Sequence, residues 1–111
     1  MEITVEPRDQ ATAVVRPVGR LDLISAGPFK ERLVAAVGDG LFRLVIDLHA
    51  VSFIDSSGLG ALIGGLKTTR LSGGDLRIVR PSSQATTILE LTNLNRVLVS
   101  YRSVEDALAS F

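Results

Sequence analysis

The pattern of apolar and polar residues predicts strands at the start and in the middle of the chain. "EITVE" alternates Ile3 and Val5 with polar neighbours, the period of a half-buried strand. "ATAVVRPV" predicts a second strand. Because Pro17 cannot donate a ladder hydrogen bond, we expect this strand to lie at a sheet edge or to end near residue 17. "LFRLVIDL" is nearly all apolar and predicts a central strand covered on both faces.

One helix is predicted before that central strand in the sequence, and one after it. The first begins near Pro28, which suits a first helical position, and "GDG" at 38–40 ends it. The second follows Ser57 and ends at "SGG", 72–74. Its apolar positions at helical spacing are Leu59, Leu62, Ile63 and Leu66.

The last third of the chain continues the alternation. "DLRIV" and "RVLVSY" predict strands, and "PSSQATTILEL" between them predicts a short helix capped by serine. Ser103 and Asp106 form a capping box that opens a terminal helix ending near Phe111. The order β-β-α-β-α-β-α-β-α predicts a single α/β domain over residues 1–111. Its central sheet is mostly parallel, with helices packed on it.

Composition and charge narrow the possible functions. The 111 residues are 46% hydrophobic and 22% charged, with twelve basic against twelve acidic side chains. This balance predicts no direct nucleic-acid or membrane partner. The absence of cysteine excludes disulfides and cysteine zinc sites. No apolar stretch approaches the ~20 residues of a spanning helix, so we expect a soluble, cytoplasmic protein.

The stretch "FIDSSGLG" places Asp55, Ser56 and Ser57 where a strand gives way to a helix. One interpretation makes Asp55 or Ser56 the helix N-cap, which leaves a second hydroxyl unexplained. A Rossmann fingerprint is broken at Ile63, a P-loop misses its spacing by one residue, and the G-x-S-x-G elbow is absent. Nucleotide binding by neighbouring helix N-termini stays open as an alternative, with hydrolase activity a distant third.

No catalytic or metal-binding constellation is expected. His49 is the only histidine, and we interpret it as a solvated residue at a strand end. We therefore predict that the protein is not an enzyme and has no metal and no cofactor.

Small residues fill one face of the second helix, namely Gly60, Ala61, Gly64, Gly65 and Thr68. Each glycine inside a helix lowers the stability of the helix by about 1 kcal/mol relative to alanine. The glycines of this helix therefore call for a structural or functional explanation. Either the face packs closely within the chain, or it is a smooth surface on which another protein docks. On the second interpretation, Gly60, Ala61 and Gly64 belong to a partner-binding surface.

The segment "VIDLHAVSFIDSSGLGALIGGLK" resembles the signature of anti-sigma factor antagonists in the STAS domain family. "GRLDL", which contains Asp22, resembles a turn of the same family, and the predicted order of elements agrees over nearly the whole chain. The resemblance implies a bacterial partner switch in transcription and stress response. Such a protein binds an anti-sigma factor that is also a serine kinase, and this binding releases the sigma factor.

The resemblance also implies roles for particular residues. Ser57, the second serine of the pair, corresponds to the site that the kinase phosphorylates and that a protein serine phosphatase restores. The surrounding surface would be formed by Asp22, Asp55, Ser56 and Gly58. STAS domains also serve as subunits of transport systems and stress-signalling assemblies, which is the alternative that the resemblance leaves open.

Overall fold

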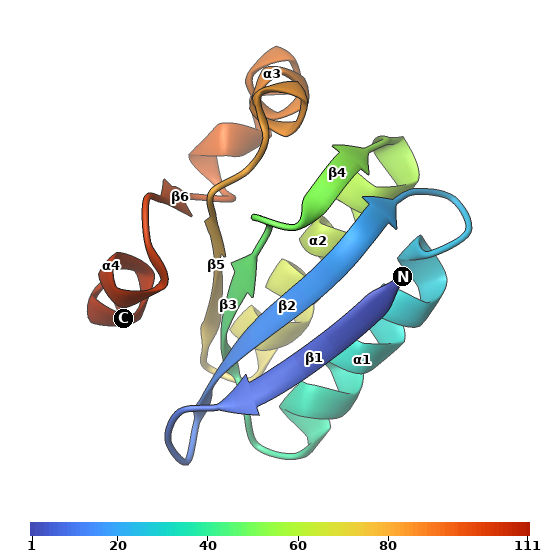
Figure 1. Cartoon of the computed structure of the whole chain (residues 1–111). Helices are drawn as coiled ribbons and strands as arrows, with labels where there is room; N and C mark the ends of the chain where they lie inside the picture. Colours follow the sequence, from blue (N-terminus) through green and yellow to red (C-terminus); the bar gives the residue numbers. More distant parts are fainter.

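Six strands form one sheet with helices packed on it (Figure 1). The computed structural model describes all residues from Met1 to Phe111. In chain order the elements are β1 (Glu2–Pro7), β2 (Thr12–Leu21), α1 (Ala26–Gly38), β3 (Arg43–Asp47), β4 (Val51–Ile54), α2 (Ser56–Leu71), β5 (Asp75–Val79), α3 (Ser83–Leu91), the 3-10 turn η1 (Leu94–Arg96), β6 (Ser100–Tyr101) and α4 (Val104–Ala109). The prediction of an α/β fold is confirmed.

The strands are arranged in the order β1-β2-β3-β5-β6, with β4 paired to β2. Only the β1–β2 pair is antiparallel, and the other pairs are parallel. Strand β3 lies between β2 and β5, and its residues from Leu44 to Asp47 are all buried. The predicted interior position of "LFRLVIDL" and the mostly parallel sheet are therefore confirmed.

The prediction for the second strand was wrong. Strand β2 runs through Pro17 to Leu21 and lies inside the sheet. Its register with β3 ends at Val15 and its register with β4 begins at Gly19, so Pro17 lies in the gap between these two partners. A missing N–H is tolerated there because that stretch of β2 has no parallel neighbour.

Strand β4 is the element that the apolar pattern did not reveal. Four residues, Val51 to Ile54, pair with the end of β2 beyond a register shift between Gly19 and Arg20. Gly19 has a φ of 113°, a conformation that favours glycine, and this irregularity lets β2 pass from one partner to the next. Strand β6 is shorter than "RVLVSY" predicts, because η1 occupies the start of that segment.

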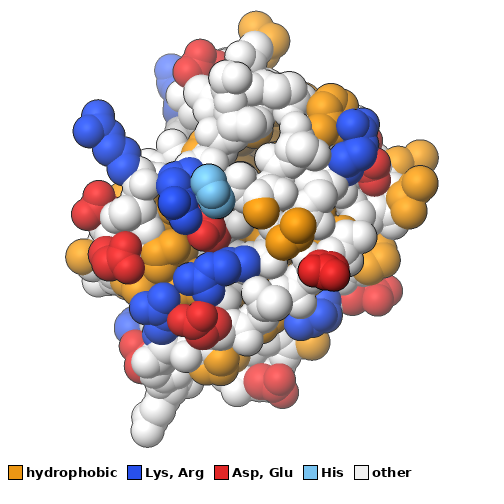
Figure 2. Space-filling model, viewed as in Figure 1, with side chains coloured by type: hydrophobic (Ala, Val, Ile, Leu, Met, Phe, Trp, Pro, Cys, Tyr) orange, Lys and Arg blue, Asp and Glu red, His pale blue; other side chains and the backbone are white.

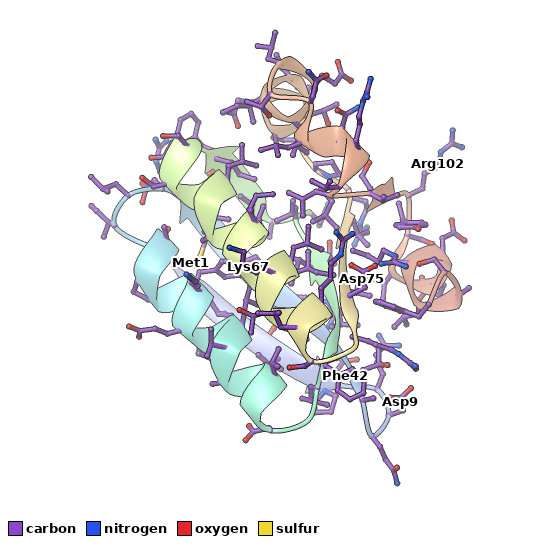
Figure 3. All side chains as sticks on the ribbon, turned by 180° about the vertical axis from the view of Figure 1, so that it is seen from behind. Met1, Asp9, Phe42, Lys67, Asp75 and Arg102 are labelled. Atoms are coloured by element: carbon purple, nitrogen blue, oxygen red, sulfur yellow. The ribbon has the colours of Figure 1, made fainter.

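The helices cover the two faces of the sheet unequally. Helices α1 and α2 lie side by side over one face, as Figures 1 and 3 show. On the main core side, Leu59, Leu62 and Leu66 of α2 are buried as predicted, whereas Ile63 is only partly buried. Helix α4 packs on the opposite face, where its Val104 and Ala107 form a second cluster with Val14, Val45 and Val79 of the sheet.

The face opposite α1 and α2 carries interspersed basic and acidic side chains (Figure 2). Asp47, buried at the end of β3, accepts a hydrogen bond from Arg80 at 3.0 Å and lies 3.6 Å from Arg16. His49 beside it is exposed, in agreement with the prediction of a solvated residue. None of the helices has both the length and the apolar character needed to cross a membrane.

The small residues of α2 serve mainly internal packing. A Cβ atom on Gly65 would lie 2.5 Å from Leu33 of α1 and 3.2 Å from Leu76 of β5. Ala61 is buried in the same core. At Gly64 a Cβ atom would meet only the flexible end of Lys30, and at Gly60 it would meet nothing. The close approach of α1 and α2 therefore explains much of this face, and only Gly60 is fully open.

Candidate functional site

The N-terminus of α2 is fixed by Asp55. This residue has an extended backbone, and its Oδ1 atom accepts a hydrogen bond from the N–H of Gly58 at 2.9 Å. Such a bond satisfies one of the N–H groups that have no partner inside the helix. Of the two N-caps that the sequence allowed, Asp55 is the one observed. Neither serine hydroxyl is needed for the cap.

The second oxygen of Asp55 holds a different part of the chain. Its Oδ2 atom accepts a hydrogen bond from the N–H of Leu23 at 3.1 Å. Leu23 lies in the loop between β2 and α1, 32 positions earlier in the sequence. One carboxylate therefore joins this loop to the first turn of α2, and the two segments form one surface.

The β2–α1 loop is also fixed internally by Asp22. Its Oδ1 atom accepts hydrogen bonds from the N–H groups of Ile24 at 3.1 Å and Ser25 at 3.3 Å. The Ser25 hydroxyl donates to the carbonyl of Arg20 at 2.6 Å. Asp22 thus organises the turn, as an aspartate ahead of a helix commonly does.

The electrostatics of Asp22 favour its ionised form. Desolvation acts to raise the pKa of this carboxyl group. The N–H donors of Ser25 and Ile24, followed by the guanidinium of Arg20, act in the opposite direction, and the net pKa lies below its ordinary value. Asp22 is therefore a carboxylate at neutral pH and a constant negative charge beside the loop.

The two serines occupy the first two positions of α2. Ser56 is exposed and Ser57 is half-buried. Of the other residues predicted for the partner-binding surface, Gly60 is exposed, whereas Asp22, Asp55 and Gly64 are half-buried. Gly58 and Ala61 are buried, so the expectation that they lie on an exposed surface was wrong.

Gly58 has a structural role at this point of the fold. A Cβ atom there would collide with the backbone carbonyl of Leu21, at the end of β2. Only glycine lets the first turn of α2 approach this strand so closely. Gly58 therefore sets the position of Ser57 relative to the β2–α1 loop without contributing surface of its own.

Gln84 is a supporting residue that the sequence analysis did not identify. Its Oε1 atom accepts a hydrogen bond from the N–H of Ile54 at 3.0 Å, and its Nε2 atom donates to the Ile54 carbonyl at 2.7 Å. The side chain acts like a neighbouring strand and closes the edge of β4 next to Asp55. The two residues are 30 positions apart, so no local pattern could have revealed this contact.

Two large apolar residues next to the serines were also missed. Leu23 and Ile24 are 77% and 86% exposed, at the tip of the loop that Asp55 holds. Apolar side chains of this size in a turn between a strand and a helix are a sequence signal that could have been used. We call the exposed part of this end of the molecule the switch face, consisting of Asp22, Leu23, Ile24, Ser56, Ser57 and Gly60.

Neither of the two surface grooves of the structure includes a serine of the switch face. One lies along α2 and η1, and the other lies on α1 near Lys30 and Val34. The switch face thus lies outside both grooves, which suits contact with another macromolecule more than enclosure of a small ligand.

Comparison with known proteins identifies the family. Residues 2–107 match the STAS domain, so this chain belongs to the STAS domain family. The anti-sigma-B factor antagonist of Bacillus subtilis is 30% identical over 99 residues, which cover 88% of this chain and 90% of that protein.

Solved structures agree with the fold in detail. A crystal structure of an anti-sigma factor antagonist from Mycobacterium paratuberculosis has a TM-score of 0.86 and 29% identity, and the match covers 98% of this chain and 92% of that one. The Bacillus cell fate determinant SpoIIAA, solved in a phosphorylated form, has a TM-score of 0.77 and 20% identity. This match covers 98% of each chain and supports the fold alone.

The two glycines in the first part of α2 give a matched test of the site geometry. Gly58→Ala should destabilise the protein by about 2 kcal/mol or more, because the added methyl group forces backbone apart. Gly60→Ala, where the methyl group meets open space, should be neutral or stabilising by up to ~1 kcal/mol. Chemical denaturation of both variants measures the difference. Equal stability of the two would contradict the close approach of α2 to Leu21.

Proposed function

We propose that this protein is an anti-sigma factor antagonist that binds an anti-sigma factor with serine kinase activity and is released when Ser57 is phosphorylated. The observation that carries the proposal is that Asp55, and not one of the two serines, caps the start of α2. Asp55 supplies the cap and holds the apolar tip of the β2–α1 loop, which leaves the half-buried Ser57 free of the capping role. The family membership and the anti-sigma-B factor antagonist relatives support the same function.

The switch face has the composition expected for a docking surface. Leu23 and Ile24 provide exposed apolar contact area, which is the part of an interface that contributes most when buried. Asp22 and Ser56 provide polar groups at the rim. The hydrogen bond from Leu23 to Asp55 holds the loop in place before a partner arrives, which reduces the entropy lost on binding.

Phosphorylation of Ser57 would change this surface by charge. A phosphate adds about −1.5 to −2 charge at pH 7. It would join the carboxylates of Asp55 and Asp22, and a docked partner would have to desolvate the added charge. An uncompensated charge at such an interface costs on the order of 2–5 kcal/mol of binding free energy.

The same phosphate would be tolerated by the free protein. Ser57 is in the first turn of α2, where the helix dipole and unpaired N–H groups stabilise negative charge by ~0.3–1 kcal/mol. Partner binding can therefore be switched without unfolding the domain. A protein serine phosphatase that removes the phosphate would return the antagonist to its binding form.

Substitutions of Ser57 test the charge mechanism directly. Ser57→Glu should weaken binding to the anti-sigma kinase by on the order of 2–5 kcal/mol. Ser57→Gln introduces a side chain of the same shape as glutamate but without the charge, and it should weaken binding much less. Isothermal titration of each variant against the kinase gives the affinities, and thermal unfolding should give nearly unchanged midpoints. If Ser57→Glu and Ser57→Gln bind alike, charge is not the switch.

Substitutions of the apolar loop tip test the docking surface separately. Leu23→Gln combined with Ile24→Gln should reduce kinase affinity by about tenfold or more, because two exposed anchors are lost. The free energy of unfolding should change by less than ~0.5 kcal/mol, since both side chains are in solvent. Leu91→Gln, at a residue that is 79% exposed at the end of α3, is the matched control. An equal loss of affinity in the control would argue against a specific role for the loop.

A further inference from the structure

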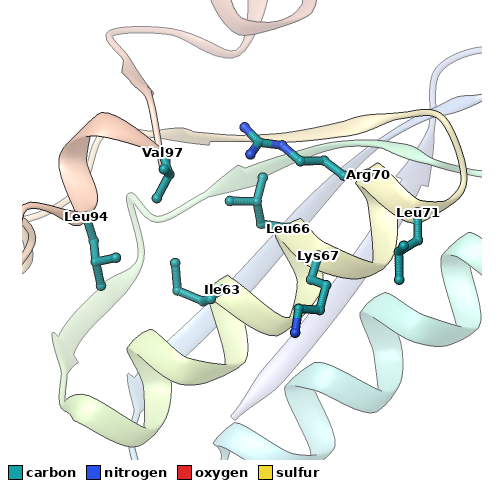
Figure 4. Close-up of a pocket in the computed structure, with 7 residues that line it drawn as sticks. All are labelled: Ile63, Leu66, Lys67, Arg70, Leu71, Leu94 and Val97. Carbon is teal, nitrogen blue, oxygen red and sulfur yellow. The ribbon is translucent and has the colours of Figure 1, made fainter.

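The more apolar of the two surface grooves lies away from the switch face, along the outer side of α2 (Figure 4). It occupies about 440 Å³ between α2 and the segment around η1. Five of its seven lining residues are hydrophobic. Its volume is within the ~300–1,000 Å³ range of small-molecule sites.

The groove has two apolar walls. Ile63 and Leu66 of α2 lie on one side, and Leu94 and Val97 lie on the other, as Figure 4 shows. Leu71, which is 83% exposed, extends the apolar surface to the end of α2. From Ile63 to Leu71 the helix rises by about 12 Å, so the groove is an elongated strip that fits a chain-like ligand.

The charges at the groove are all of one sign. Lys67 and Arg70 line it, and no acidic residue does. Lys67 takes part in none of the ion pairs of the protein, whose seven salt bridges all involve arginine. An apolar strip bordered by two cations is complementary to an apolar chain that carries an anionic group.

Arg70 can serve a ligand at little cost to the fold. It lies 3.2 Å from Asp75, and its side chain is half-exposed. Asp75 is also paired with Arg77, at 2.6 Å. If Arg70 turns toward a ligand, Asp75 therefore keeps a cationic partner, and no carboxylate is left without one.

We propose that this groove binds a free, monomeric medium- or long-chain carboxylate. The alkyl chain lies between the two apolar walls, and the carboxylate is held by Lys67. Arg70 leaves α2 in a different direction (Figure 4) and supports the contact only when it turns away from Asp75. The α2 residues of the site, from Ile63 to Leu71, follow Ser57 by six or more positions, so the groove does not overlap the switch face.

Decanoate, at concentrations where it stays monomeric, is the probe that tests this proposal. In a titration followed by NMR of methyl groups, the resonances of Leu66, Leu71, Leu94 and Val97 should shift and reach saturation. The methyl groups of Leu23, on the switch face, should not move. Absent or non-saturating shifts, or shifts spread over the whole surface, would overturn the proposal.

Charge variants and a neutral ligand test the role of the cations. Lys67→Glu should weaken decanoate binding by about tenfold or more, the effect of losing a charge-assisted contact. Arg32→Glu, the same reversal at an exposed position of α1, should leave the affinity unchanged. Decanol should bind wild type and Lys67→Glu equally. If both reversals weaken decanoate alike, the attraction is non-specific and the proposed site is wrong.

Two further measurements on the same protein test whether the groove contacts a membrane or a second copy of the chain instead. Binding to vesicles that contain anionic lipid, without saturable binding of decanoate, would identify the strip as a membrane-contact surface. Concentration-dependent broadening of the groove methyl groups without ligand would identify it as a contact between two copies of the chain. Either result would overturn the proposal of a free carboxylate ligand.

Discussion

The arrangement of the candidate site depends on one carboxylate. Asp55 uses one oxygen to cap α2 and the other to hold the N–H of Leu23, so the helix start and the β2–α1 loop cannot be placed independently. Both acceptors are committed to backbone donors, and each bond satisfies a group that would otherwise have to find a water partner. The serines are therefore presented on a frame that is already ordered. A chemical change at Ser57 acts on a fixed surface, which is why charge alone is sufficient for the switch that we propose.

Two further contacts keep this frame in position, and both come from other parts of the fold. Gly58 lets α2 approach the carbonyl of Leu21, and Gln84 of α3 closes the backbone edge of β4 at Ile54. Strand β2, strand β4 and helix α3 thus meet where α2 begins. Ligand and partner sites of α/β proteins tend to lie at the carboxyl ends of parallel strands, and the switch face follows this rule.

The sequence predicts those features whose cause is local. The apolar run of β3, the stripe of α2 and the serine at the start of α4 are each set by residues within a few positions, and all are observed, although Ile63 of the stripe is only partly buried. Strand β4 has only four residues, and it pairs with β2 only because the register shifts at Gly19, which a local pattern does not contain. The pairing of Gln84 with Ile54 and the bond from Leu23 to Asp55 also join distant segments. The small residues of α2 fitted two interpretations, and only the packing of α1 distinguished between them.

We propose that Ser57 carries the regulatory phosphate of an anti-sigma factor antagonist of the STAS domain family. The most direct measurement is the intact mass of the protein after incubation with ATP and the candidate anti-sigma kinase, followed by peptide mapping. We expect the mass increase of a single phosphoryl group, located on Ser57, with Ser56 unmodified. A phosphoryl group on Ser56, or an unchanged mass in the presence of an active kinase that binds the protein, would contradict it.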